Sequence, residues 1–270
     1  MPSSHHASSL PGPLPAFSLS GIGYSLKTKA LLQGLTFDLP AGRSIALVGH
    51  NGSGKSTLLK LLARQQRPGE GEIRFMGEPL DGWNARAFAR RLAYLPQYTP
   101  VAPGMKVREL VALGRYPWHG ALGRFGAKDA EKVEEAIERT GIAPLAERLV
   151  DTLSGGERQR AWLAMMVAQD ADCLLLDEPI SALDIGHQLE VMSLVRDLAR
   201  DRGMTVVTVL HDINMAARFC DLIVALHSGR VMSTSTPEDV MNPDALQRIY
   251  NVRMDVLQQP QGGYPVAYAC

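Results

Sequence analysis

The chain has 270 residues, of which 46% are hydrophobic and 21% are charged, a composition typical of a globular protein with a sizeable core. Lys plus Arg and Asp plus Glu number 28 each, so the formal net charge is zero, and this balance argues against a dedicated nucleic-acid-binding protein. Three well-separated cysteines, Cys173, Cys220 and Cys270, predict neither a disulfide framework nor a metal cluster and favour a reducing compartment.

The sequence predicts one folded domain, residues 16–255, between two tails. Residues 1–15 lack the basic and apolar regions of a secretory signal and are expected to be disordered. Residues 256–270 carry no clear secondary-structure signal and are expected to form a C-terminal tail. No apolar run nears the roughly 18 residues needed to cross a bilayer, so any role at a membrane would be that of a bound, peripheral subunit.

The first hundred residues are predicted to combine several strands with one helix. The pattern at 17–27 and the compact apolar run "SIALV" (44–48) predict strands, the second of them buried in a parallel sheet. Leucines at helical spacing in "KSTLLKLLAR" (55–64) predict a helix. Two further strands are expected at "GEIRFMG" (71–77) and "LAYLPQ" (92–97).

The loop between the strand at 44–48 and the following helix fits the pattern G-x-x-x-x-G-K-[ST]. Its small residues leave backbone N–H groups accessible to a polyphosphate, and the helix points its positive end at the same place. Lys55 adds a mobile charge for the β- and γ-phosphates, the Ser56 hydroxyl can bind Mg²⁺, and Thr57 can reach the α-phosphate. The loop is therefore predicted to bind a nucleoside triphosphate through Gly49, His50, Asn51, Gly52, Ser53, Gly54, Lys55, Ser56 and Thr57.

Helical periodicity and few strand signals mark residues 106–169. In "DAEKVEEAIERTGI" (129–142) the charged residues are expected to face solvent, and the apolar face consists of Ala130, Val133, Ala136 and Ile137. These patterns predict a mostly helical subdomain, about 101–169, inserted into an α/β core formed by 16–100 and 170–255.

Strand signals return in "CLLLDEP" (173–179), "TVVTVLH" (205–211) and "LIVALH" (222–227), with helical stretches near 187–201 and 212–219 between them. This alternation predicts a parallel sheet covered on both faces. Asp177 ends the first of these strands, where a carboxylate can hold Mg²⁺ through its water shell, and Glu178 can polarise a water for in-line attack on the γ-phosphate. An Asp-Glu pair is a weak signal alone but a strong one together with the phosphate-binding loop.

With "LSGGERQR" (153–160) between them, the loop at 49–57 and "LLLDEP" (174–179) resemble the motifs of ATP-binding-cassette (ABC) ATPases, and the likeness extends over about 17–250. The resemblance implies a RecA-like P-loop NTPase core with a helical subdomain between the Q-loop and the signature motif, ATP and Mg²⁺ as cofactors, and a head-to-tail dimer. In such a dimer the helix N-terminus capped by Ser154 is an anion site for the γ-phosphate held by the other copy. The signature residues expected to act on the partner's ATP are Leu153, Ser154, Gly155, Gly156 and Glu157.

Further roles follow from the same resemblance. Gln97 resembles the Q-loop glutamine that reaches Mg²⁺ and the attacking water, and His211 resembles the switch histidine that contacts the γ-phosphate. With Glu178 they are the expected catalytic residues, and Ser56, Gln97 and Asp177 are the expected metal ligands. Tyr24 occupies the place of the aromatic residue that stacks on adenine. The D-loop at the dimer seam is expected at Ser181, Ala182, Leu183 and Asp184.

Two positions depart from the family pattern. His50 stands where proline is more common, and Ile180 stands where threonine is common. Neither change removes a phosphate donor or a charge. The change at Ile180 puts hydrogen bonding near the catalytic glutamate in doubt and is expected to alter the rate only modestly.

Within the family the sequence resembles the ATPase subunits of bacterial iron-siderophore and vitamin B12 importers, and in particular those of ferric hydroxamate importers. The resemblance rests on "GHNGSGKSTLLKLLARQQ", "FARRLAYLPQ", "VRELVALGRYPWHGALGRFG", "LVDTLSGGERQRAWLAMMVAQD" and "VLHDINMAARFCD". It implies a homodimer on the cytoplasmic face of the bacterial inner membrane, docked on an integral permease that receives cargo from a periplasmic siderophore-binding protein. A groove lined by residues 97–110 would receive a short permease helix, and "GRYPWHGALGRFG" (114–126) either packs locally or adds to that docking surface.

Three alternatives stay open. The ATPase of a haem, vitamin B12 or catecholate-siderophore importer would carry the same nucleotide motifs. A soluble ABC ATPase acting in translation or DNA repair usually has two cassettes or a long coiled-coil insertion, whereas this sequence predicts one cassette, a short insertion and no heptad run. A P-loop protein that binds ATP without cleaving it would not need Glu178, Gln97 and His211 together.

Overall fold

The computed structural model describes residues 14–100, 102–120, 123–181, 183–258 and 263–270. Most of the N-terminal tail expected over 1–15, and Ala182 of the expected D-loop, lie outside these ranges. The described strands are β1 (Phe17–Leu26), β2 (Lys29–Leu39), β3 (Ser44–Val48), β4 (Glu70–Phe75), β5 (Glu78–Pro79), β6 (Leu92–Leu95), β7 (Cys173–Asp177), β8 (Thr205–Val209), β9 (Leu222–His227), β10 (Arg230–Ser235), β11 (Met254–Leu257) and β12 (Val266–Ala269). The described helices are α1 (Lys55–Leu62), α2 (Ala85–Arg91), α3 (Val107–Leu113), α4 (Tyr116–His119), α5 (Ala127–Arg139), α6 (Gly155–Ala168), α7 (Ile185–Arg202), α8 (Ile213–Phe219), α9 (Pro237–Val240) and α10 (Pro243–Tyr250), with 3₁₀ turns at Leu80–Gly82, Ala143–Leu145 and Val150–Thr152.

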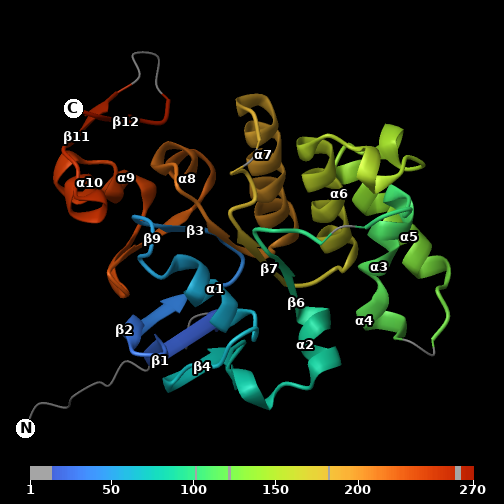
Figure 1. Cartoon of the computed structure of the whole chain (residues 1–270), viewed down its shortest axis with the longest axis horizontal. Helices are drawn as coiled ribbons and strands as arrows, with labels where there is room; N and C mark the ends of the chain where they lie inside the picture. Colours follow the sequence, from blue (N-terminus) through green and yellow to red (C-terminus); the bar gives the residue numbers. More distant parts are fainter. Residues whose placement is uncertain (1–13, 101, 121–122, 182, 259–262) are drawn as a thin grey trace, which may run out of the picture.

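A six-stranded sheet in the order β10-β9-β3-β8-β7-β6 forms the centre of the molecule, and all its strands except β10 run parallel. A four-stranded antiparallel sheet has the order β2-β1-β4-β5, and β11 and β12 form a separate hairpin. Figure 1 shows α3, α4, α5 and α6 grouped at one end of the molecule, away from the β1–β2–β4 sheet and the hairpin. The arrangement is the predicted α/β core with an inserted helical subdomain.

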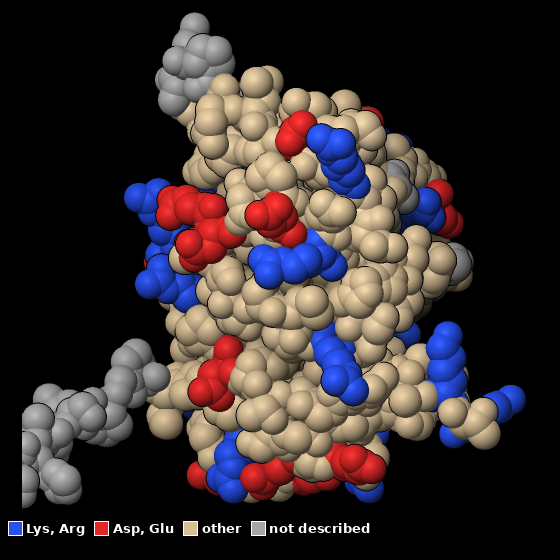
Figure 2. Space-filling view, turned by 90° about the vertical axis from the view of Figure 1, so that its left-hand side faces the viewer, with Lys and Arg blue, Asp and Glu red and all other residues tan. Residues whose placement is uncertain are grey.

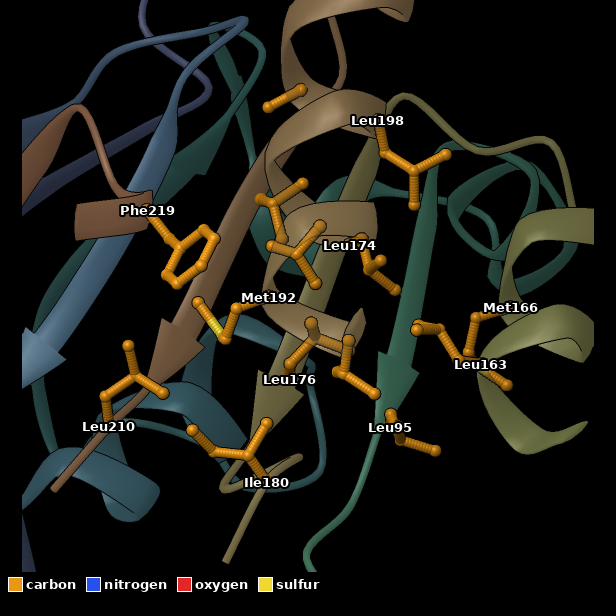
Figure 3. Close-up of a cluster of buried hydrophobic side chains, with 14 of the residues drawn as sticks. Leu95, Leu163, Met166, Leu174, Leu176, Ile180, Met192, Leu198, Leu210 and Phe219 are labelled. Carbon is orange, nitrogen blue, oxygen red and sulfur yellow. The ribbon is translucent and has the colours of Figure 1, made fainter. Parts of the chain in front are cut away.

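The residues of β3 show how the central sheet joins two layers. Ala46 and Val48 belong to a core cluster that includes the helices of the insertion, α7 and α8, whereas Ile45 and Leu47 belong to a second cluster with α1 and the four-stranded sheet. Side chains alternate between the two faces of a strand, so the continuous apolar run predicted as a buried parallel strand is covered on both faces. Figure 3 shows the first cluster, where side chains of β7 lie against those of α7.

Within the expected C-terminal tail, 256–270, the described residues include the end of β11 and all of β12, which pair as a hairpin. The hairpin packs on the core through the buried Ala267, and the Asn214 side chain of α8 bonds to the backbone of that residue. Asn214 accepts a hydrogen bond from the Ala267 N–H at 2.7 Å and donates one to the Ala267 carbonyl at 3.1 Å. Strand β2 was also not predicted from the sequence. Gly34, with φ of 62°, and shifts in the pairing register with β1 interrupt the alternation of apolar and polar residues along it.

The predicted apolar face of α5 is wrong at one position. Val133, Ala136 and Ile137 are buried as expected, but Ala130 is exposed. Asp129, which was expected to face solvent, is buried instead. The reason is an ion pair: Arg115, only 2% exposed, donates from Nε to Asp129 Oδ1 at 2.9 Å, and a buried carboxylate is tolerated when it has such a partner.

Candidate nucleotide-binding and catalytic site

The phosphate-binding loop follows β3 and has a backbone that only glycine can adopt at two points. Gly49 has φ of 140°, and a Cβ there would lie 2.0 Å from the Leu226 carbonyl oxygen. Gly54 has φ of 104°, and a Cβ there would lie 2.6 Å from Leu32 Cδ2. Gly54 is also the N-cap of α1 and offers no side chain to bond its first N–H groups. The helix therefore begins with backbone donors directed to the loop, which is an anion-binding arrangement.

Lys55 folds back across this loop. Its Nζ donates to the carbonyl oxygens of Gly49 at 2.8 Å and His50 at 3.0 Å, and the residue is only 5% exposed. Burial lowers the pKa of Lys55, although the nearby carboxylates of Glu178 and Asp177 favour its charged form. The ammonium group is thus held inside the loop, close to two negative charges.

Asp177 joins the end of β7 to the beginning of α1. Its Oδ1 accepts a hydrogen bond from the Ser56 hydroxyl at 2.8 Å, and the residue is 2% exposed. Burial raises the pKa of Asp177 and outweighs the Ser56 hydrogen bond and the nearby Lys60, which act in the opposite direction. A buried carboxylate of this kind is stabilised by a positive charge beside it.

Glu178 is held by two side chains from neighbouring strand ends. Its Oε2 accepts a hydrogen bond from Gln97 Nε2 at 2.8 Å, and its Oε1 lies 2.7 Å from His211 Nε2. Gln97 follows β6 and His211 follows β8, and these strands flank β7 in the sheet. Glu178 has φ of 53°, an uncommon value for a residue other than glycine and one found at functional sites. The structure thus brings the three predicted catalytic residues into direct contact.

The turn between β9 and β10 supports the loop from behind, and sequence reasoning missed it. The Gly229 N–H donates to the Ser53 carbonyl at 3.0 Å, and a Cβ on Gly229 would lie 2.5 Å from the Leu31 carbonyl oxygen. The His50 ring packs edge-on against His227 with centroids 4.6 Å apart. The "SG" pair at 228–229 signals a turn, but nothing local in the sequence connects that turn to the loop.

Tyr24 lies on β1, where it pairs with Leu32 of β2. It lines a cavity of about 940 Å³ together with Gln33, Arg67 and Glu70. Leu32 lines the same cavity and also contacts Gly54 of the loop. Leu32 thus lies between the cavity and Gly54, and the adenine-stacking role of Tyr24 stays a prediction.

The signature residues lie apart from this pocket. Ser154 caps α6: its Oγ accepts a hydrogen bond from the Glu157 N–H at 3.3 Å, and the Glu157 carboxylate accepts one from the Ser154 N–H at 2.8 Å. Gly155 is exposed and has open space beside its Cα. Between the described residues of 153–157 and those of 49–57 there is no hydrogen bond or ion pair, and Figure 1 shows β7 and α7 between α6 and α1.

The described residues of the D-loop are fixed by local hydrogen bonds. The Ser181 hydroxyl donates to the Glu178 carbonyl at 3.2 Å, and Asp184 caps α7 by accepting a hydrogen bond from the His187 N–H at 3.0 Å. Gln188 Nε2 donates to the carbonyl oxygens of Ile180 at 3.2 Å and Leu183 at 3.0 Å. Ile180 itself is buried in the core, and its backbone carbonyl is bound by Gln188.

A family model described as ABC transporter matches residues 32–181, which include the loop, Gln97, the signature and Glu178. The chain belongs to the ABC transporter family. It is 40% identical over 245 residues to the ferric enterobactin transport ATP-binding protein FepC of Escherichia coli (strain K12), covering 91% of this chain and 90% of that protein. It is also 40% identical over 247 residues to the iron(3+)-hydroxamate import ATP-binding protein FhuC of Bacillus subtilis (strain 168), covering 91% of each.

Solved structures agree with this assignment. A metal-chelate type ABC transporter in an inward-facing conformation matches with a TM-score of 0.82 and 27% identity, covering 95% of this chain and 98% of that chain. A bacterial ABC transporter cassette solved as a dimer matches with a TM-score of 0.73 and 26% identity, covering 82% and 98%. The predicted ABC fold is confirmed, and the chain is an ATP-hydrolysing transport ATPase. In the described part of the chain, no helix is long and apolar enough to cross a bilayer.

Proposed function

We propose that this ABC ATPase powers the import of ferric siderophores of the hydroxamate class across the bacterial inner membrane. The observation that supports its enzymatic part best is the contact of Glu178 with both Gln97 and His211 beside the phosphate-binding loop. Relatives that are named for ferric enterobactin transport and for iron(3+)-hydroxamate import support a ferric siderophore as the cargo, and the sequence resemblance favours the hydroxamate class. The chain itself would not contact the cargo.

The residues of the pocket have separate roles in this proposal. The loop and Lys55 hold the triphosphate, while Glu178 accepts a proton from the attacking water. Gln97 and His211 orient the Glu178 carboxylate. Oxygen atoms of Ser56, Asp177 and Gln97 are the hard ligands that Mg²⁺ prefers, and the cation bound there would neutralise phosphate charge.

The proposed active unit is a head-to-tail dimer of this chain. The signature helix presents its N-terminus and the exposed Gly155 outward rather than to its own nucleotide pocket. A second copy facing the first would place that helix N-terminus beside the γ-phosphate, where its backbone donors are complementary to negative charge. Each nucleotide would then be enclosed by two chains.

The proposed permease contact lies between the Q-loop segment and α6. A cavity of about 460 Å³ there is lined by Tyr94, Leu95, Pro96, Pro100, Trp162, Met165 and Met166, together with Lys60 and Gln65. Tyr98, next to it in the chain, is 83% exposed. An apolar groove with an exposed aromatic residue suits a short helix, and we propose that a helix of the permease binds there. The ATPase would then lie peripherally on the cytoplasmic face of the membrane. The periplasmic binding protein would contact the permease and not this chain.

Transport into vesicles tests the cargo. The ATPase and its genomically adjacent permease and binding protein would be reconstituted, and ATP-dependent uptake of ferric hydroxamate, ferric catecholate, haem and vitamin B12 would be measured. We expect ferric hydroxamate to be taken up at least tenfold faster than the others, a difference of about 1.4 kcal/mol or more in transition-state binding, and no uptake with Glu178→Gln. Equal or faster uptake of another cargo would reassign the substrate.

A further inference from the structure

A cavity of about 710 Å³ lies at the amino-terminal edge of the central sheet, opposite the edge that carries the nucleotide pocket. Its wall is formed by the residue before β3, the end of α8, parts of α7 and α9, and the chain around the hairpin. The lining residues used below are Arg43, Arg196, Arg218, Phe219, Asp221, Glu238 and Tyr264. Neither the nucleotide site nor the proposed permease groove includes any of them.

Three guanidinium groups meet at this cavity. Arg196 and Arg218 both stack on the buried ring of Phe219, with their Cζ atoms 5.4 Å and 5.2 Å from its centroid. The Arg43 and Arg218 side chains form no ion pair with any described residue, while Arg196 has one at 3.6 Å to Asp197.

Neither carboxylate that lines the cavity, Asp221 or Glu238, forms an ion pair with its arginines in the described chain. Asp221 is directed into the fold, where its Oδ2 accepts hydrogen bonds from the Ser44 N–H at 2.8 Å and the Ser44 hydroxyl at 3.0 Å. Glu238 on α9 is therefore the one lining carboxylate in the described chain that is not held in this way. Figure 2 shows basic and acidic side chains interspersed on the side that carries the hairpin and α10, so no extended basic surface accompanies the arginine cluster.

We propose that this cavity is an effector site for a small ligand bearing phosphate or carboxylate oxyanions. Guanidinium groups bind such planar or tetrahedral oxyanions in a bidentate manner. The volume falls within the range of small-molecule sites and is too small for a polymer. The half-exposed Tyr264 supplies aromatic surface for the remainder of the ligand.

The site can influence hydrolysis without competing with ATP. Strand β3 separates Arg43 from Gly49 by roughly 20 Å, so the two ligands do not overlap. Helix α8 begins directly after His211 and Asp212 and ends at Phe219, so it connects the cavity to the switch histidine over about 10 Å. A ligand that moves the end of α8 would change the contact between His211 and Glu178. This regulatory part rests on the proposed function, whereas ligand binding does not.

Calorimetry on the full chain tests the site. The protein would be saturated with a non-hydrolysable ATP analogue, so that the phosphate-binding loop is occupied, and titrated with glycerol 2-phosphate and with tricarballylate. We expect at least one probe to bind, and the double variant Arg43→Gln/Arg218→Gln to bind it about tenfold more weakly or worse. Arg200→Gln, an exposed residue of α7 outside the cavity, should leave binding unchanged.

The outcomes separate the parts of the inference. Binding of glycerol 2-phosphate alone identifies a phosphate ligand, and binding of tricarballylate alone identifies a carboxylate ligand. Absence of binding by both probes, or equal binding to the double variant, would overturn the site. The double variant should keep the basal ATPase rate, and the bound probe should change that rate only in the wild-type protein. Binding with no change in rate would overturn the effector role while leaving the proposed transport function intact.

Discussion

The carboxyl edge of the central sheet and the helical subdomain carry their functional residues in different ways. At the sheet edge, Ser56 bonds to Asp177, and Gln97 and His211 both contact Glu178, so each side chain is fixed by another from the same pocket. In the subdomain, the hydrogen bonds of Ser154 stay within the first turns of its own helix, to Glu157 and Arg158. The pocket at the sheet edge is therefore formed within one chain, whereas the signature surface in the subdomain is expected to act only when a second chain binds to it.

The subdomain is nevertheless firmly attached to the core. Trp118 lies between the guanidinium groups of Arg90 and Arg115, with Cζ atoms 5.1 Å and 5.0 Å from its ring centroid, and its indole N–H donates to the Gln169 carbonyl at 2.7 Å. Arg90 and Arg86 also donate to the carbonyl oxygens of Pro117 and Trp118. This part of "GRYPWHGALGRFG" thus packs between the subdomain and α2, which is the local-packing alternative, while Tyr116 stays half exposed.

The largest expected effect is the loss of ATP turnover when the pocket at the sheet edge loses its general base. Glu178→Gln keeps the shape of the side chain but cannot accept a proton, so ATP turnover should fall by about 10²–10⁴-fold while ATP binding is retained. Phosphate release and binding of a fluorescent ATP analogue would measure the two properties. Glu131→Gln, an exposed change on α5, is the control. If Glu178→Gln hydrolysed ATP at the wild-type rate, Glu178 would not be the general base.

The pocket was predictable from the sequence because its signals are local. A glycine-rich loop after an apolar strand marks Lys55, and an acidic pair at the end of another apolar strand marks Asp177 and Glu178; Gln97 and His211 came from the family resemblance, and parallel strand ends meet at one edge. Alternation and helical spacing also predicted the central sheet and the inserted helices.

The supporting contacts were not predictable, because they join residues far apart in the chain. Ser228 donates its N–H to His50 across 178 positions, and Asn214 binds Ala267 across 53 positions. A short polar residue followed by glycine signals a turn but not what the turn touches. The strands of the β11–β12 hairpin were not predicted for a related reason, since two four-residue strands are stable only when another element packs against them.

A second, smaller effect tests the exposed signature surface. Gly155→Asp has room for its side chain, since a Cβ at this position would have no atom within 4 Å, and an acidic residue in the first turn of a helix does not destabilise it. The isolated chain should therefore fold and bind ATP normally. Against a second copy, the new carboxylate would face the γ-phosphate, and like charges in contact cost several kcal/mol.

Sedimentation in the turnover-blocked Glu178→Gln background measures this effect directly. We expect ATP to produce dimers of Glu178→Gln, and the added Gly155→Asp change to weaken dimerisation by about 100-fold or more. Gly82→Asp adds the same charge at another exposed glycine with open space and should leave dimerisation unchanged. If Gly155→Asp formed ATP-driven dimers of normal stability, the head-to-tail arrangement would be contradicted. The signature residues of one chain would then not contact the nucleotide of the other.

The smallest effect concerns how the subdomain is held together. Burial of Asp129 opposes its ionisation, but the Gly126 N–H and the Arg115 guanidinium favour the carboxylate more strongly and hold the pKa of Asp129 below its ordinary value of 3.8. A carboxyl group with a lowered pKa in the folded state stabilises the protein above its unfolded pKa, and that contribution is lost as the pH falls through the folded value. Asp129→Asn should therefore cost about 1.5–3 kcal/mol at neutral pH, and its difference from wild type should shrink below about pH 4. Urea unfolding at a series of pH values would measure this, with the exposed Asp201→Asn as the control. A difference that stays constant into acid would mean that Asp129 acts through packing rather than through its charge, and that the subdomain does not depend on this ion pair.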